Sequence, residues 1–307
     1  MSNILVEKLD TFTGHRDCVY AISNGNSENI FFTGAADGMV VKWDLNEPNE
    51  GKVVAQTKGS VYALYFDEEN NQLLIGENFH GIHIIDLQTD TQIKSIKLTE
   101  SAIFDIKIVN SQILVATGDG KVLVYNQLTG DLEKILNESS QSARCIAIGE
   151  TEIAVGYSDF KIRIFSKLDF QLLKTIDAHQ NSVFCLAYHP LTQDLISGSR
   201  DAHLKIWDSA NNYELKKSIV AHLFAINHIA FSPDCEWFAT CSMDKSVKVW
   251  DAKEYQLLKV IDKSRHAGHA TSINKLLWIT KGQLLASVSD DRSISIWKLT
   301  NNKKYLK

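Results

Sequence analysis

The sequence predicts an all-β protein built from seven copies of one unit of about forty residues. Short apolar, β-branched runs recur along the 307 residues and are separated by clusters of Gly, Asp, Asn and Ser. Such runs indicate many antiparallel strands and little helix. One strand in each unit ends in Trp-Asp or in a weaker copy of that pair. The copies fill the chain, so we expect residues 1–307 to form a single domain.

The strand endings recur at nearly constant intervals. The aromatic residue of the pair, or its substitute, stands at Trp43, Ile85, Tyr125, Phe165, Trp207, Trp250 and Trp297, and the repeats end near residues 44, 86, 126, 166, 208, 251 and 298. The intervals are 42, 40, 40, 42, 43 and 47 residues. Residues 262–268 account for most of the extra length of the last interval. We expect them to project as a loop, which either serves recognition or is a tolerated insertion without function.

Three further residues keep a constant register with the Trp in four of the units. An Asp precedes the Trp by six residues, a Ser or Thr precedes this Asp by four, and a His precedes it by 22. The four complete sets are His15, Thr33, Asp37 and Trp43; His179, Ser197, Asp201 and Trp207; His222, Thr240, Asp244 and Trp250; and His269, Ser287, Asp291 and Trp297. Chance does not repeat three independent spacings four times, so these units share one structure.

The pattern that runs from Gly-His or Ala-His to Trp-Asp resembles the WD40 family. It begins at Gly14-His15, Ala178-His179, Ala221-His222 and Gly268-His269, and the resemblance covers essentially the whole chain. The resemblance implies a seven-bladed β-propeller, in which four-stranded antiparallel blades surround a central channel.

The N-terminal segment matches the outer strand of the other repeats. Phe12 precedes His15 by three residues, as Ile176 precedes His179, and Leu9 also keeps the register. We therefore expect the start of the chain to supply the outer strand of the last blade. Closing the ring in this way hides a sheet edge that would otherwise invite aggregation.

A recurring Ser, His and Asp could also indicate nucleophilic catalysis. The resemblance implies a structural role instead: the Asp accepts a hydrogen bond from the His, the His contacts the Ser or Thr, and that hydroxyl accepts the indole N–H. The set occurs four times and its hydroxyl is already engaged, whereas a nucleophile is singular and free. We expect no catalytic residue.

Blades two to four lack the complete set. Blades three and four keep the turn carboxylate as Asp119 and Asp159 but have no matching His. Blade two has Phe79 at the Asp position and Ile85 at the Trp position. The sequence therefore predicts that the polar network is concentrated in blades five, six, seven and one.

In related propellers, partners contact mainly three positions per blade on the top face, the end that carries the His loops and the Asp turns. Carried over to this chain, the predicted partner-binding residues are Tyr20, Tyr62, Phe104, Arg144, Phe184, Arg200, Asn227, Met243, Asn274 and Asp290. The aromatic residues and the Arg among them have the composition of an interface hot spot. The alternative is that they pack against neighbouring blades or line a water-filled channel.

Residues 179–185 resemble the matching stretch of propellers that clamp an arginine side chain between aromatic rings. A protein or peptide that presents Arg or Lys is therefore a candidate partner, inserting between Phe184, Phe104 and the tyrosines. We expect a non-catalytic protein-interaction scaffold, a monomeric propeller that works within a larger complex.

Composition argues against several other classes of function. A net charge of −5 and a pI near 6.1 disfavour nucleic-acid binding. No stretch approaches the ~20 apolar residues of a membrane span, and residues 1–8 do not resemble a secretory signal. The five cysteines form no Cys-x-x-Cys pair, which is typical of free thiols in a reducing compartment. We expect a cytoplasmic protein.

The main alternative is a propeller enzyme, similar to a metal-dependent hydrolase, that uses polar residues at the channel mouth. Its candidate residues are Asn78, Asn227, Asn274 and Asp290. Two His pairs, at 80 and 83 and at 266 and 269, are each three residues apart. Neither the polar residues nor the pairs supply the three or four convergent ligands that zinc or calcium needs, so we expect no metal and no cofactor.

Overall fold

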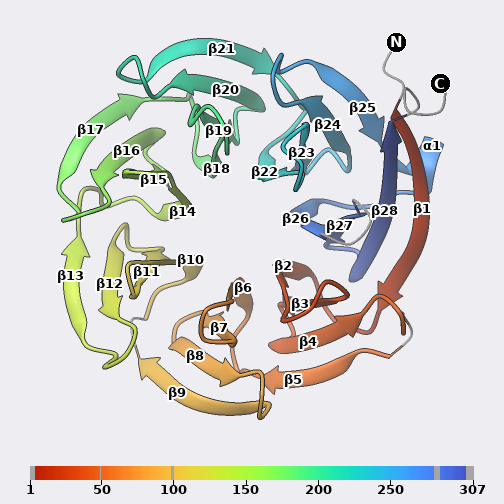
Figure 1. Ribbon diagram of the computed structural model, residues 1–307, viewed down its shortest axis with the longest axis horizontal. Coiled ribbons are helices and arrows are strands. Elements are labelled where there is room, and N and C mark those ends of the chain that lie inside the picture. The colour runs from red at the N-terminus through yellow and green to blue at the C-terminus, as the bar shows by residue number, and fades with distance from the viewer. Residues whose placement is uncertain (1–3, 49, 98–99, 280–283, 302–307) are drawn as a thin grey trace.

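The computed structural model describes residues 4–48, 50–97, 100–279 and 284–301. These residues form seven four-stranded antiparallel sheets, arranged as blades in a ring around a central channel (Figure 1). The seven-bladed propeller that the WD40 resemblance implies is therefore confirmed.

Each blade runs outward from the channel in chain order. Blade one contains β2 (Val19–Asn24), β3 (Ile30–Ala35), β4 (Met39–Asp44) and β5 (Lys52–Gln56). Blade two contains β6 (Val61–Asp67), β7 (Gln72–Glu77), β8 (Gly81–Asp86) and β9 (Thr91–Lys97). Blade three contains β10 (Ile103–Val109), β11 (Gln112–Thr117), β12 (Val122–Asn126) and β13 (Leu132–Leu136). Blade four contains β14 (Ala143–Ile148), β15 (Glu152–Tyr157), β16 (Lys161–Ser166) and β17 (Leu172–Asp177).

The remaining blades follow the same order up to the closure of the ring. Blade five contains β18 (Val183–Tyr188), β19 (Leu195–Ser199), β20 (His203–Asp208) and β21 (Glu214–Val220). Blade six contains β22 (Ile226–Phe231), β23 (Trp237–Ser242), β24 (Val247–Asp251) and β25 (Leu257–Ile261). Blade seven contains β26 (Ile273–Ile279), β27 (Leu284–Ser289), β28 (Ser293–Asn301) and, outermost, β1 (Ile4–Thr13).

The N-terminal strand closes the ring, as the sequence predicts. β1 pairs with β28 in antiparallel register from Ile4 opposite Asn301 to Thr13 opposite Ser293. Near its end, Phe12 is buried with its ring centroid 5.6 Å from that of Trp43 on β4. The strand therefore joins the two ends of the chain and also packs against blade one.

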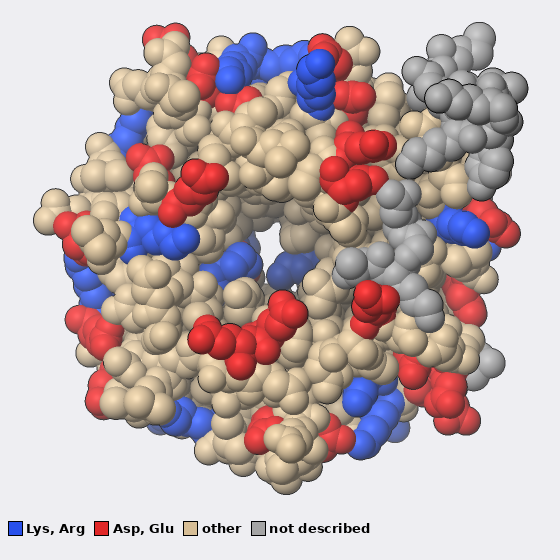
Figure 2. All heavy atoms as spheres, in the orientation of Figure 1, with Lys and Arg blue, Asp and Glu red and all other residues tan. Residues whose placement is uncertain are grey.

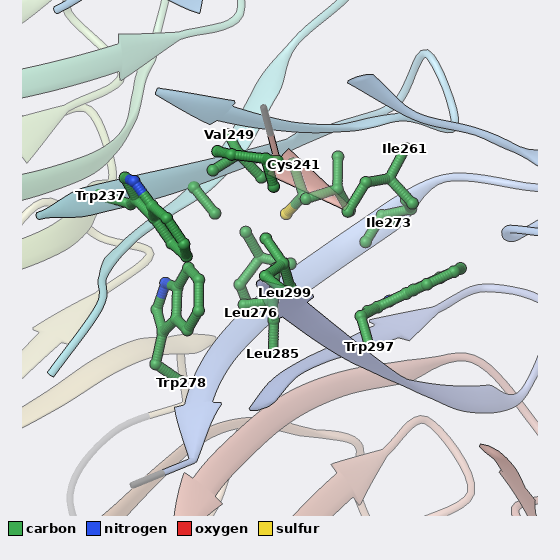
Figure 3. Packing of buried hydrophobic residues seen from close by; sticks show 13 residues of the cluster. Trp237, Cys241, Val249, Ile261, Ile273, Leu276, Trp278, Leu285, Trp297 and Leu299 are labelled. Atoms are coloured by element: carbon green, nitrogen blue, oxygen red, sulfur yellow. The ribbon is translucent and has the colours of Figure 1, made fainter. Parts of the chain in front are cut away.

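Close packing between blades holds the ring together. On the seam between blades six and seven, Trp237 on β23 and Trp278 on β26 point toward each other with ring centroids 6.4 Å apart (Figure 3). Where backbones come closest, the second strand carries Gly: a Cβ added at Gly34 would lie 2.5 Å from the side chain of Val61 on the next blade. Such interdigitation matches the dense packing of protein interiors, so the blades cannot separate without opening cavities.

Residues 262–268 form more than a simple projecting loop. They contain α1 (Lys263–His266), the single helix in the described ranges, whose N-cap Asp262 accepts a hydrogen bond from the Arg265 backbone N–H. Lys8 on β1 donates to the carbonyl of Ala267 at 2.8 Å. The insertion is thus bound to the outer strand of blade seven, away from the channel mouth (Figure 1).

Candidate functional site

The His loops and the Asp turns lie at the same end of the blades, which we call the top face. In the four complete sets, His Nδ1 lies 3.3, 3.0, 2.9 and 3.0 Å from the nearest Asp oxygen, in chain order. His Nε2 lies 2.7, 2.8, 2.8 and 2.9 Å from the Ser or Thr hydroxyl. The Trp Nε1–H donates to the same hydroxyl at 2.7, 2.9, 2.9 and 2.9 Å. Each set is one continuous hydrogen-bonded chain.

One protonation state satisfies every group in these chains. The indole donates to the hydroxyl, the hydroxyl donates to His Nε2, and His Nδ1–H donates to the carboxylate, which requires a neutral imidazole. Consistent with this, burial lowers the pKa of His15, His179 and His222. Burial alone would raise the pKa of Asp201 and Asp244, but hydrogen bonds from their His partners hold it far below the usual range.

These four hydrogen-bonded sets do not have the geometry of a nucleophilic site. Thr33, Ser197, Thr240 and Ser287 have 0% exposed surface, so no substrate reaches their hydroxyls. Each hydroxyl already accepts an indole N–H. The sets therefore act as internal supports that connect the top loops of a blade to its third strand.

Aromatic side chains from successive blades form a row along the channel mouth. The ring of Tyr20 meets that of Tyr62 edge to face at 4.6 Å, and Tyr62 stacks on Phe104 at 6.1 Å. The row continues through Arg144 to Phe184 on β18. All five residues are partly exposed. The sequence left open whether these residues pack against neighbouring blades or are accessible to a partner. In the structure they do both, because they pack on one another and are still partly exposed.

Comparison with known families agrees with this architecture. The model of the WD domain, G-beta repeat, matches residues 6–44, 170–208, 213–251 and 261–298, just over half of the chain. The chain belongs to the WD40 family. The four matched segments are those that contain the complete His, Asp, hydroxyl and Trp sets. A comparison with curated proteins gave no match. WD40 propellers generally act as protein-interaction scaffolds.

Arg144 changes the role expected for the aromatic residues of this WD40 propeller. Its guanidinium carbon lies 4.2 Å from the ring centroid of Phe104 and 5.1 Å from that of Phe184, and its Nε–H donates to Ser158 at 3.0 Å. The sequence led us to expect that a partner's Arg or Lys would insert between these two rings. The chain's own guanidinium occupies the space between these two rings, so a partner's cation would have to displace Arg144 to insert there.

The other predicted contact residues fall into two groups. Asn227 donates to the Ile273 carbonyl at 2.8 Å, and Asn274 donates to the Val19 carbonyl at 2.9 Å and to Asp290 at 2.7 Å. These bonds tie blades six, seven and one together at the channel rim. Arg200 and Met243 are exposed instead, beside the Asp turns of blades five and six, and are accessible to a partner.

Two lysines from different blades lie on the channel wall. Lys107 pairs with Asp105 at 2.8 Å, whereas Lys275 from blade seven reaches only the Tyr62 carbonyl, at 3.4 Å. Figure 2 shows Lys and Arg atoms inside the central opening. Burial and the nearby lysines lower the pKa of His228 to about 3, so that its ring is neutral. The hollow that Lys107 and His228 line is also lined by Glu28, Asp67, Glu68 and Glu69.

The residues weighed for a metal-dependent enzyme have other roles. Asn78 accepts a hydrogen bond from the Ile103 backbone at 2.8 Å, and Asn227, Asn274 and Asp290 take part in the rim contacts described above. Within the described ranges, no group of three or more His, Cys, Asp or Glu side chains is arranged to hold a metal ion. No helix in the same ranges is long and apolar enough to cross a membrane.

Blades two to four contain substitute polar contacts that the sequence pattern did not reveal. In blade two, Glu77 accepts hydrogen bonds from the Lys58 and Gly59 backbone N–H groups at 2.8 Å and pairs with His83 at 2.7 Å. Blade three pairs Lys121 with Asp119 at 2.6 Å, and blade four pairs Arg163 with Asp159 at 2.7 Å. The complete networks lie in blades five, six, seven and one, as predicted, and blades two to four contain shorter polar contacts of a different kind.

A repeated lysine contact between blades was also missed. A lysine of the outer strand reaches the turn before the outer strand of the next blade at five consecutive seams. The pairs are Lys52 with the Asp90 carboxylate, Lys94 with the Leu128 carbonyl, Lys134 with the Asp169 carbonyl, Lys174 with the Asn212 carbonyl and Lys217 with the Glu254 carbonyl. The lysines are 42, 40, 40 and 43 residues apart, so the repeat period was a signal that could have identified them.

Proposed function

We propose that this propeller is a non-catalytic scaffold that binds a protein or peptide partner on its top face, around the mouth of the central channel. The observation that carries the proposal is the row Tyr20, Tyr62, Phe104, Arg144 and Phe184. Each member has large, partly exposed apolar area and is held in place by its neighbours. Aromatic and Arg side chains that are rigid before binding lose little conformational entropy on association and dominate interface energies.

The charges near Arg144 favour an acidic segment of the partner at this end of the row, whereas Asp290 lies near Tyr20 at the other end. Arg144 and the exposed Arg200 stand at the mouth, and Lys107 and Lys275 stand further along the channel wall. Burial lowers the pKa of the Arg144 guanidinium, which indicates that this cation is poorly hydrated. A carboxylate placed beside it would regain electrostatic stabilisation and accept hydrogen bonds from its free N–H groups.

All five cysteines are free thiols, which supports a cytoplasmic location for this scaffold.

Affinity capture with paired variants tests the proposal. Tyr62→Ala combined with Phe184→Ala removes two members of the row, and Arg144→Gln removes the charge. The matched control is Leu168→Ala, because Leu168 is 88% exposed in the turn between β16 and β17, at the opposite end of the blades. Circular dichroism and thermal melting establish that each variant is folded.

We expect the wild type and the control to retain the same proteins, and the two row variants to lose at least one of them. Identical retention by all four proteins would show that the row does not bind the partner.

A further inference from the structure

A groove opens between blades one and two, away from the channel mouth. It encloses a cavity of about 560 Å³. Its apolar walls come from Val54 on β5 and Ile85 on β8, and its polar walls include Thr57, Lys58, His83 and Lys97. A cavity of this size lies within the range of pockets that hold small ligands or single side chains.

The groove exists because this seam lacks an aromatic ring. Ile85 lies opposite Leu73 as Trp43 lies opposite Phe31, so Ile85 occupies the Trp position of blade two. In blade one, Trp43 packs on Phe12 of the neighbouring outer strand at 5.6 Å. All the other blades keep Trp, Tyr or Phe at this position.

The His position of blade two is also occupied by a smaller residue, Thr57. The space that a ring and an imidazole take up in blade one is therefore only partly filled here, and Val54 on the facing strand remains half-buried. The groove at this seam follows from these two substitutions.

The free charges around the groove are positive. The Glu77 carboxylate is already engaged by the Lys58 and Gly59 backbone N–H groups and by His83. Hydrogen bonds from these groups, opposing burial, hold the pKa of Glu77 below its usual value. Among the described residues, Lys58 and Lys97 form no ion pair, and both are exposed. The groove thus joins an apolar floor to two ammonium groups that have no carboxylate partner.

We propose that this groove is a second binding site, which takes an aromatic side chain of a partner segment with a neighbouring carboxylate. The ring fills the place of the missing Trp against Val54 and Ile85. The carboxylate pairs with Lys58 or Lys97. This site is independent of the top-face row, because none of its residues belongs to that row.

The probe for this site is N-acetyl-L-phenylalanine, which combines one aromatic ring with one carboxylate. N-acetyl-L-phenylalaninamide keeps the ring without the charge, and acetate keeps the charge without the ring. Binding is measured by amide chemical-shift changes on titration. From the size of the probe, we expect a dissociation constant on the order of 1 mM, with shifts centred on residues 54–58 and 83–85.

The decisive variant is Ile85→Trp, which restores the ring of the repeat. We expect this substitution to lower the affinity for N-acetyl-L-phenylalanine at least tenfold. The melting temperature should stay equal or rise. Binding of the acid to Ile85→Trp with wild-type affinity would overturn the proposal, as would the absence of shifts in this groove with the wild type at 20 mM probe, about twenty times the expected constant.

A second variant keeps the test valid if Ile85→Trp does not fold. Lys58→Glu combined with Lys97→Glu reverses both exposed charges, and Lys253→Glu, on a side chain that is 90% exposed, is the matched control. We expect the double variant to bind N-acetyl-L-phenylalanine severalfold more weakly and to bind the amide with unchanged affinity. Equal affinity of the acid for the double variant and the control would contradict the role of the lysines. Tyr62→Ala should leave the probe's affinity unchanged, which separates this site from the top face.

Discussion

The Arg144 guanidinium lies between the rings of Phe104 and Phe184, with its carbon 4.2 Å from one centroid and 5.1 Å from the other. Three successive blades thus share one stacked unit at the channel mouth. We predict a measurable energetic coupling between Arg144 and Phe184. In a double-mutant cycle with Arg144→Met and Phe184→Leu, the coupling free energy should be about 0.5–2 kcal/mol by urea denaturation. Strictly additive effects would mean that the stack contributes nothing to stability.

The hydroxyl of Thr240 should be essential to blade six. It accepts the Trp250 indole N–H at 2.9 Å and lies 2.8 Å from His222 Nε2, with no exposed surface. Thr240→Val keeps the shape of the side chain but leaves Trp250 Nε1 and His222 Nε2 without this partner. The free energy of unfolding should therefore fall by about 2–4 kcal/mol. Thr240→Ser keeps the hydroxyl and is the control. Equal urea midpoints for the two variants would refute the role of the hydrogen bonds.

Ring closure by the N-terminal strand should depend on Phe12 more than on the rest of β1. Phe12 is 1% exposed, whereas Leu9 in the same strand is 45% exposed. Phe12→Ala should cost roughly 3–5 kcal/mol of unfolding free energy, and Leu9→Ala much less. Deletion of residues 1–12 should lower the melting temperature strongly. A deletion variant that melts with the wild type would show that the ring does not need this strand.

The sequence predicts the blades of the ring better than it predicts the side-chain contacts at the channel mouth. Seven blades and the closing strand could be predicted because four blades repeat the same short-range spacings, as Phe12 and His15 illustrate, and the other three keep the period of about forty residues. The position of Arg144 could not, because it depends on rings from blades three and five that approach only in the closed ring. The Glu77–His83 pair was missed because both residues lie outside the positions of the repeat pattern.

Stability should decrease as the pH falls below neutrality. Burial lowers the folded-state pKa of His15, His179 and His222 from about 6.5, so the unfolded chain binds protons that the folded chain does not. The melting temperature should therefore fall as the pH drops below about 6.5. It should fall further below about pH 4, where the unfolded state begins to protonate carboxyls such as Asp201 and Asp244, whose folded pKa is lowered.

The same pH series with His179→Gln isolates one titrating group. Its melting temperature should be lower at pH 7.5 and should decline less between pH 6.5 and 5. A wild-type melting temperature that rises between pH 7 and pH 5 would contradict neutral, buried histidines.

Site-specific photocrosslinking tests most directly whether the top face is the docking surface. p-Benzoylphenylalanine is placed at Met243, 50% exposed beside the Asp turn of blade six, and in a second protein at Leu168 on the opposite end. We predict a crosslinked partner band with the probe at position 243, and its loss when Tyr62→Ala and Phe184→Ala are added to that protein. A partner crosslinked only from position 168, or a band at 243 unaffected by the two substitutions, would contradict docking on the aromatic row.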